Sequence, residues 1–180
     1  MKNIFLAIAI FFSINTNAQV TKVNLQAGGL TCSMCSNAIN KALKSLDYVD
    51  KVNANIKNSS FDILFKPNAK VNFDDIKKKV EDAGFSVAKL TATVHFNNQS
   101  IAPDEHIIVN GLTFHFLNLK SQELNGDKVL QVVDKGYVSP KAFKKNELYT
   151  SMECYKTGVA GSCCSKGGVA SGTRIYHVTI

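Results

Sequence analysis

Arginine is almost absent from this chain of 180 residues: Arg174 is the only one among 21 basic residues, and the others are lysines. Proteins that recognise nucleic acids use arginine for paired hydrogen bonds to phosphates and bases. The formal net charge of +7 therefore does not predict a nucleic-acid partner, and we interpret the lysines as dispersed over solvated surfaces. Glycine-rich phosphate loops and the nucleophile elbow of hydrolases are also missing from the sequence, which argues against both kinds of enzyme.

A long apolar run is missing as well. The single marked run, residues 4–12, follows a lysine and is well short of the about 20 apolar residues that span a bilayer. Together with the small and polar residues that come next, it is typical of a signal peptide. We predict that residues 1–18 are removed after Ala18 and that the mature chain is exported from Gln19 onward, without stable insertion in a membrane.

The sequence contains five cysteines, all of them after the predicted cleavage site. An exported protein meets an oxidising compartment, in which cysteines tend to pair as disulfides. Because five is an odd number, at least one thiol is expected to be free, bound to a metal or paired with another chain. The five are Cys32 and Cys35 near the N-terminus, and Cys154, Cys163 and Cys164 near the C-terminus.

Hydrophobic periodicity in the first half of the mature chain predicts both strands and helices. Apolar residues recur at every second position in the expected strands and at every third or fourth position in the expected helices. The element order is that of a split βαβ, or ferredoxin-like, fold, so we predict an α+β domain over residues 20–95. Asn72 is placed to cap its second helix and Gly84 to end it. The expected elements are strand 23–27, helix 38–46, strand 49–56, strand 61–65, helix 73–80 and strand 85–90.

Two short segments of this domain carry a closer resemblance. Residues 29–35 read Gly-Leu-Thr-Cys-Ser-Met-Cys just before the first expected helix, and residues 82–85 read Asp-Ala-Gly-Phe after the second. In this pattern and element order the domain resembles the heavy-metal-associated domains of copper chaperones, of copper-transporting ATPases and of the periplasmic mercury-binding protein. Leu30 stands where the family usually has methionine, but one apolar residue replaces another, so we expect the site to be spared.

Cys32 and Cys35 are the predicted main metal site. Their spacing at a loop-to-helix junction brings two sulfurs to one ion, and the positive helix N-terminus favours the thiolate form. Two thiolates select soft ions such as Cu(I), the expected ligand, or Hg(II), and they also accept Zn(II) or Cd(II). Without a third ligand the ion stays open to attack by a partner's thiolate, which suits transfer better than storage. The resemblance implies that Phe85 covers the loop and that Met34 points outward; Thr31 is expected to support the loop.

A thiol–disulfide oxidoreductase is the main alternative for the same two cysteines, because exported redox enzymes share the Cys-x-x-Cys spacing. Their fold places the motif after a buried strand and brings a cis-proline opposite the thiols. The three prolines here, Pro67, Pro103 and Pro140, do not stand in a convincing position. A purely structural bridge is the weakest interpretation, since closing so short a loop gains little entropy.

The second half of the chain has a different pattern of polar and apolar residues, and we recognise no family for it. Residues 96–105 are polar and are predicted to be a linker, followed over residues 106–180 by a small mainly-β domain, a barrel or sandwich with one helix. Asn110-Gly111 predicts a two-residue hairpin turn, and Ser139-Pro140 predicts the start of the helix. The other expected elements are a turn at 125–127, a strand at 129–133 and a final strand at 174–180.

Cys154, Cys163 and Cys164 lie in a glycine-rich stretch and allow two interpretations. In the first, Cys154 forms a structural disulfide with one of the other two, because adjacent cysteines bridge each other only with strain. In the second, the three thiols form another soft-metal site, helped by Met152 or His177. The sequence leaves both interpretations open.

The histidines give no sign of a metal site of their own. They are scattered along the chain, and no pair has a ligand spacing such as His-x-x-x-His. We expect His115, between two phenylalanines of a strand, to be half-buried or on the surface, and His106 to belong to a solvated acidic loop.

The predicted function is that of an exported, periplasmic protein that carries or buffers Cu(I) through Cys32 and Cys35. It would pass the ion by thiolate exchange to or from a protein partner, with a metal-bridged dimer as a further option, and neither task requires catalysis. The resemblance to bacterial periplasmic proteins implies the compartment. If the ion is mercury, the same residues serve a scavenger. Beside the oxidoreductase, a third class of function is a docking role for the β-rich domain, with the metal domain reporting metal status.

Overall fold

The computed structural model describes residues 18–30 and 32–180. The predicted signal peptide lies outside the described residues except for Ala18, and Thr31 lies outside them too. None of the helices in the described part of the chain is long and apolar enough to cross a membrane.

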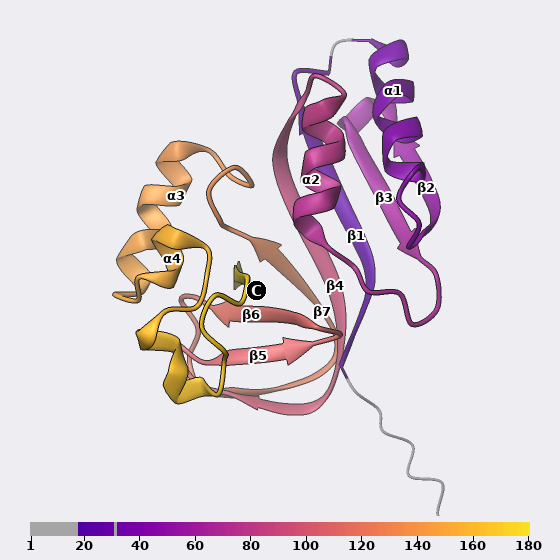
Figure 1. The fold of residues 1–180 in the computed structure, drawn as a ribbon. Helices are drawn as coiled ribbons and strands as arrows, with labels where there is room; N and C mark the ends of the chain where they lie inside the picture. The colour runs from indigo at the N-terminus through magenta and orange to yellow at the C-terminus, as the bar shows by residue number, and fades with distance from the viewer. Residues whose placement is uncertain (1–17, 31) are drawn as a thin grey trace, which may run out of the picture.

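One eight-stranded mixed sheet runs through the protein, with its strands in the order β2-β3-β1-β4-β7-β8-β6-β5 (Figure 1). The first four strands follow the order β1-α1-β2-β3-α2-β4, and both helices lie on the same face of the sheet. This arrangement confirms the predicted α+β, ferredoxin-like fold. The bounds are β1 Gln19–Gly28, α1 Ser33–Lys44, β2 Val49–Asn55, the 3-10 helix η1 Ile56–Asn58, β3 Ser60–Phe65, α2 Phe73–Asp82 and β4 Ser86–Ile101.

The two helices combine defined ends with a buried apolar stripe. As predicted, Asn72 caps α2: its Oδ1 accepts hydrogen bonds from the backbone N–H of Asp74 at 2.9 Å and of Asp75 at 3.4 Å. Gly84, with a φ of 87°, follows the last turn in the left-handed conformation that ends helices. The stripes face the sheet, and their burial holds the helices to it: Ile39 and Leu43 on α1, and Phe73, Ile76 and Val80 on α2, are all 0% exposed.

Strand β4 is longer than predicted and enters the segment that we expected to be a linker. Beyond residue 95 it continues to pair with β7 (Gln122–Val132), as far as the pair of Ile101 with Gln122. Phe96 and Ile101 are 0% and 1% exposed, so buried side chains anchor both ends of this polar stretch. The two halves of the protein therefore share a sheet, and residues 96–101 belong to a strand.

The remaining strands extend this sheet, which confirms a mainly-β second half but not a separate barrel or sandwich. The predicted hairpin joins β5 to β6 through Asn110 (φ 53°) and Gly111 (φ 82°), the conformations of a type I′ turn. Ser139 caps α3 as predicted, its Oγ accepting a hydrogen bond from the N–H of Ala142 at 3.3 Å. The bounds are β5 His106–Val109, β6 Leu112–Phe116, α3 Pro140–Asn146, η2 Glu147–Tyr149, α4 Cys154–Thr157, η3 Ser162–Gly167 and β8 Ile175–Thr179.

The turn predicted at residues 125–127 is wrong. Strand β7 runs through these residues, and Gly126, with a φ of 69°, pairs with Phe96 where the register of the β4–β7 ladder shifts. An Asn-Gly pair favours positive φ, and a bulge inside a strand uses that conformation as readily as a turn does.

A polar network ties α2 to the second half of the chain. The Asp74 carboxylate accepts hydrogen bonds from the Tyr137 hydroxyl and from Arg174 Nε, each at 2.7 Å. Arg174 Nη2 also donates to Asp134 at 3.2 Å. Burial alone would raise the pKa of Asp74, but the hydrogen bonds and charge of Arg174 outweigh it and hold that pKa below its ordinary value. The only arginine of the chain thus joins the two halves.

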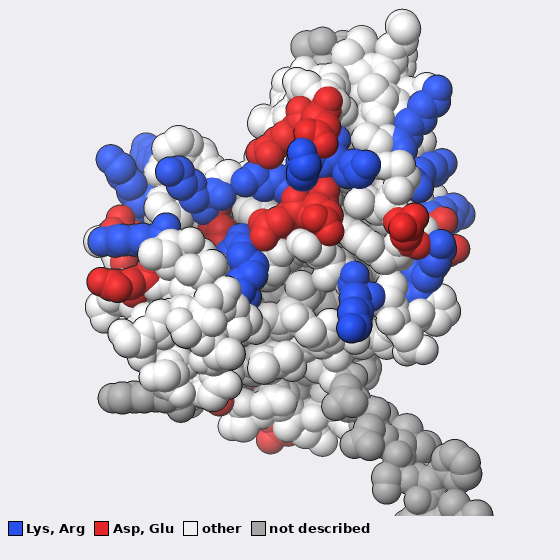
Figure 2. Space-filling model, in the orientation of Figure 1, with Lys and Arg blue, Asp and Glu red and all other residues white. Residues whose placement is uncertain are grey.

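Lysines are scattered over the face shown in Figure 2, mostly over α1, α2 and α3, with acidic side chains between them. On this face the charges of the described residues do not form a continuous basic patch. The distribution agrees with the interpretation of the lysines as a solvated, dispersed set.

Candidate metal centre

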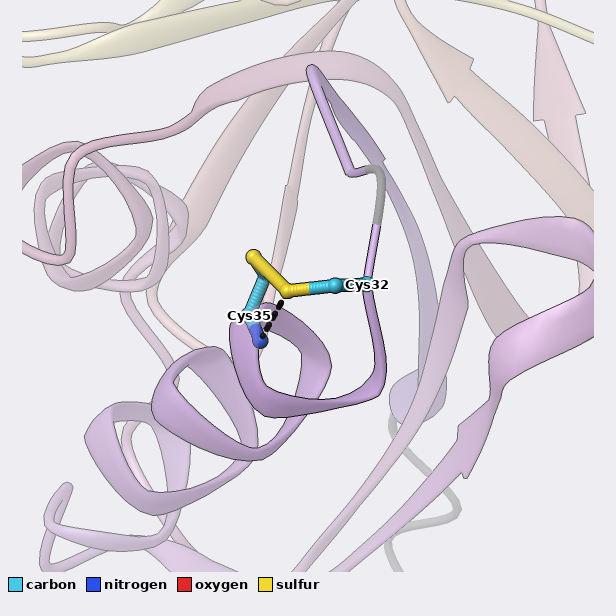
Figure 3. The surroundings of a disulfide bond; sticks show 2 residues. All are labelled: Cys32 and Cys35. Carbon is cyan, nitrogen blue, oxygen red and sulfur yellow. Dashed lines mark hydrogen bonds between the residues drawn. A yellow bond between two sulfur atoms is a disulfide. The ribbon is translucent and has the colours of Figure 1, made fainter.

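Cys32 and Cys35 lie at the start of α1, where the loop after β1 enters the helix (Figure 3). Cys32 is the N-cap, with extended φ and ψ of −147° and 158°, and its sulfur accepts a hydrogen bond from the backbone N–H of Cys35 at 3.3 Å. Within the described first turn of α1 there is no acidic residue that would oppose a thiolate. The helix N-terminus and its N–H groups therefore favour negative charge on these sulfurs.

The two sulfurs are joined by a disulfide across a Cα–Cα distance of 5.4 Å. This is the two-electron oxidised form of the pair, and only the reduced form offers two thiolates to a metal. Cys32 is exposed and Cys35 is half-buried, so an incoming thiol can approach from solvent. The geometry suits a pair that meets other molecules at the surface.

The residues around the pair are apolar on the inner side and open on the outer side. Met34, between the cysteines, is 82% exposed, as the resemblance implies, and it does not cover the sulfurs. Leu30 and Phe85 are half-buried and pack against the main hydrophobic core. The role of Phe85 as a cover over the loop stays a prediction.

Comparison with known proteins identifies relatives of the first half of the chain. A family model for the heavy-metal-associated domain matches residues 24–86. Over 65 residues the chain is 35% identical to the copper chaperone CopZ of Bacillus subtilis (strain 168), covering 36% of this chain and 93% of the chaperone. The chain belongs to the heavy-metal-associated family. Its heavy-metal-associated domain contains the Cys32-x-x-Cys35 motif, which makes this half of the protein a soft-metal-binding domain.

Other relatives match the same domain. The copper-transporting ATPase RAN1 of Arabidopsis thaliana is 38% identical over 64 residues, and the matched part covers 36% of this chain but only 6% of that ATPase. A copper-binding domain of HMA7, a P-type ATPase, is 36% identical over 37% of this chain and 89% of that structure, with a TM-score of 0.34. Oxidised MerP of Ralstonia metallidurans CH34 is 30% identical over 39% of this chain and 96% of that structure, also with a TM-score of 0.34.

The other three cysteines lie beyond the heavy-metal-associated domain, and the structure brings them together. Cys154 begins α4, and Cys163 and Cys164 lie in η3. Their sulfurs are all within 4.8 Å of one another, and those of Cys163 and Cys164 are 3.5 Å apart. All three are free cysteines, so the disulfide of the first interpretation is not formed here. Met152 is half-buried against the same small core.

His177, which the sequence analysis named as a possible helper of the three thiols, lies beside Cys154, and so does His115, which it set aside. His115 and His177 are each 0% exposed, so the expectation that His115 is half-buried or on the surface is wrong. Nε2 of His177 and Nδ1 of His115 lie 3.4 Å and 3.6 Å from the Cys154 sulfur, and the His106 ring stacks on that of His115. Burial, aided by the neighbouring His177 and His106, lowers the pKa of His115 to about 4, so its ring is neutral at neutral pH.

No sequence spacing could have revealed that His115 lies beside His177. Strands β6 and β8 pair in parallel with His115 opposite His177, although they are far apart in the chain. Ligand motifs of the His-x-x-x-His kind report neighbours on one element, whereas a parallel pair joins residues separated by several other elements. The fold, and not a local pattern, assembles the second group.

Proposed function

We propose that this protein is an exported copper carrier that binds one Cu(I) ion between Cys32 and Cys35 and exchanges it with another protein. The observation that carries the proposal is an accessible Cys-x-x-Cys at a helix N-terminus, in a heavy-metal-associated domain that aligns with nearly the whole of a copper chaperone. Its role is carriage or buffering, and it needs no catalytic step.

Transfer follows from the coordination that two thiolates provide. Cu(I) bound by two sulfurs is nearly linear and keeps a free direction, so a third thiolate from a partner can bind before Cys32 or Cys35 leaves. Each exchange forms one metal–sulfur bond and breaks another, and the oxidation state of the copper stays the same. The partner is therefore a donor or acceptor protein with its own thiolate pair, or a second copy that shares the ion.

The disulfide between Cys32 and Cys35 must be reduced before the pair can bind Cu(I). Before an ion binds, a thiol reductant must supply two electrons and two protons, and the reductant leaves as its own disulfide. We infer export from the apolar run and small residues within positions 1–18, and the periplasm from the resemblance to bacterial periplasmic proteins. That compartment would place the pair where such control by redox state operates.

Copper binding can be measured by titrating the reduced mature chain with Cu(I) against a competing chelator. The reduced wild type should bind one tight equivalent more than the double variant Cys32→Ser/Cys35→Ser. Ser33→Ala, which alters a residue between the cysteines but no sulfur, is the matched control and should behave as wild type. Equal Cu(I) stoichiometry in the wild type and the double variant would refute the proposal, and the same titration with Hg(II) tests the scavenger role.

The disulfide is also the specific observation that favours a second candidate, thiol–disulfide exchange. With a thiol reductant to regenerate the dithiol, an oxidoreductase would reduce a disulfide substrate in repeated turnovers without metal, the reductant leaving as its own disulfide, and Cys32→Ser or Cys35→Ser would stop it. A carrier would show at most one turnover per protein molecule.

A further inference from the structure

Two aspartate–histidine pairs converge on the buried sulfur of Cys154. Asp134 Oδ1 lies 2.6 Å from His177 Nδ1, and Asp104 Oδ1 lies 3.1 Å from His115 Nε2. A carboxylate only accepts hydrogen bonds, so the ring nitrogen facing each aspartate carries the proton. When such a ring is neutral, its opposite nitrogen, which faces Cys154, has no proton and can only accept a hydrogen bond.

This arrangement leaves a polar atom without a partner. A thiol has one proton, so Cys154 can donate to His177 or to His115 but not to both, and both rings are 0% exposed. His106 is grouped with His115 and Cys154, and its Nε2 is buried and makes no hydrogen bond within the described part of the chain. A buried acceptor without a donor destabilises a protein, whereas a cation accepts lone pairs from several sides.

The distances at Cys154 are of the size found between ligands of a metal ion, within two groups of ligand atoms that share this sulfur: Cys154 with Cys163 and Cys164, and Cys154 with His106 and His115. A tetrahedron with metal–sulfur bonds of about 2.3 Å has sulfur–sulfur edges of about 3.8 Å and sulfur–nitrogen edges of about 3.5 Å. The observed separations are 3.5 Å for Cys163 and Cys164, 3.4 Å for His177 and Cys154, and 3.6 Å for His115 and Cys154. Carboxylate partners on both histidines are the usual second contacts of metal-binding imidazoles.

The segment that carries the three thiols contains little regular structure. Between η2 and β8 the regular structure consists of the four-residue α4 and the six-residue η3. Its buried core is small and includes two of the thiols themselves, with Cys154, Ala160, Cys164, Val169 and Ile175 as its members. Short segments of this kind are commonly fastened by a metal, because binding energy at the site is folding energy.

A nucleophilic role is the competing explanation, since Cys154, His177 and Asp134 also have the order of a thiol, a base and an orienting carboxylate. Such a nucleophile has to meet a substrate. The Cys154 side chain is 0% exposed and lies under His115 and His177, so the sulfur is enclosed. Enclosure favours a retained ion over a reacting thiol.

We propose that Cys154, Cys163 and Cys164 together hold one thiophilic d10 ion, Zn(II) or Cu(I), beside the Asp134–His177 and Asp104–His115 pairs that contact the Cys154 sulfur. The three thiols lose their protons when the ion binds. This centre is independent of Cys32 and Cys35, which lie at a different end of the molecule, in the loop between β1 and α1 (Figure 1). Because it is enclosed, it keeps its ion where the open pair releases one.

The test uses the mature chain with Cys32→Ser/Cys35→Ser as the background, so that the exposed pair cannot contribute. The reduced protein is loaded anaerobically with Zn(II) or with Cu(I), freed of excess ion with a chelator, and analysed for bound metal. We expect one retained equivalent, and the metal that is retained distinguishes the two ions. A folded protein that retains neither ion, or one whose purified form contains a Cys154 disulfide resistant to mild reduction, overturns the proposal.

Further variants keep the test independent of folding. Cys163→Ser changes a half-buried residue and should abolish retention while the circular dichroism spectrum is preserved. Asp134→Asn changes the partner of His177 but removes no thiol, so it should weaken the affinity less than Cys163→Ser does. His95→Ala, which removes an exposed imidazole–aspartate pair outside both groups of ligand atoms, should leave retention unchanged. With Co(II) in place of Zn(II), thiolate-to-metal absorption should appear in the background variant and be absent with Cys163→Ser.

Discussion

The two cysteine groups use the same chemistry in opposite surroundings. Cys32 and Cys35 lie on an exposed loop and helix N-terminus, where other molecules can reach the sulfurs. Cys154 and Cys164 are 0% exposed, and the Cys154 sulfur lies 3.4 Å from Nε2 of His177 in the central sheet. In our two proposals, accessibility and not the kind of ligand separates a site that exchanges its ion from one that keeps it.

The two halves of the chain differ in a similar way, although they share one sheet. The first half is a complete heavy-metal-associated domain, whereas the second half adds strands to the edge of that domain at β4. The contacts of β4 and the polar network around Arg174 therefore decide whether the second half depends on the first for its stability.

The largest effect is expected from Phe96→Ala, because Phe96 is 0% exposed and packs on Phe116 of the second half, with ring centroids 6.5 Å apart. Removing a buried phenylalanine ring costs about 3–5 kcal/mol of unfolding free energy. Both halves should lose stability together in chemical denaturation, with hydrogen exchange read separately in β1 and in β8. Faster exchange in β8 alone would show that the halves unfold separately.

A smaller effect is expected from Arg174→Ala, which removes the hydrogen bonds from one guanidinium to Asp74 and Asp134. Losing hydrogen bonds between charged groups at a partly buried position costs about 1.5–3 kcal/mol. Arg174→Lys keeps the charge but not the planar fork, so it should restore only part of this loss in a denaturant titration. Full restoration by lysine would mean that charge alone joins the halves.

A still smaller effect is expected when the pH is lowered, because the contact between Asp74 and Arg174 depends on the charge of Asp74. The pKa of Asp74 is held below its ordinary value in the folded protein, so its contribution is complete above the unfolded pKa of about 4 and is lost as the pH falls through the folded pKa. Asp74→Asn lacks this contribution. The stability difference between wild type and variant should be constant from pH 5 to 7 and shrink below about pH 4, measured by urea unfolding at each pH.

The smallest effect is expected from Met34→Ala. Met34 is 82% exposed and contributes little buried surface, so neither the unfolding free energy nor the Cu(I) affinity of the reduced pair should change measurably. A clear loss of Cu(I) affinity would make its thioether a third ligand and would close the site that we describe as open.

The first half was predictable because its information is local. Periodicity, the Asn72 cap and the turn at Gly84 each act within a few residues, and the structure contains all of them where expected. The prediction of a linker at residues 96–105 was wrong because the evidence against it is not local. Phe96 and Ile101 are buried but separated by polar residues, and nothing in the neighbouring sequence indicates that this segment pairs with β7. The Asn-Gly pair at 125–126 misled because positive φ serves both bulges and turns.

The two candidate sites also differ in whether local sequence information could reveal them. Cys32 and Cys35 are three positions apart, and their spacing alone suggests a pair. The histidines around Cys154 come from β6 and β8, which meet only because the sheet places these strands side by side. A site built by parallel pairing leaves no spacing to find in the sequence.

The position of β8 also has a consequence for the order in which the protein is made. Strand β8 is synthesised after all other described strands, yet it lies inside the sheet between β7 and β6. Until residues 175–179 have emerged, β6 and β5 have no connection to the rest of the sheet, and His177 is not in place beside Cys154. The domain that carries Cys32 and Cys35 needs only β1 to β4, so it can be complete before the strand that positions His177 has emerged.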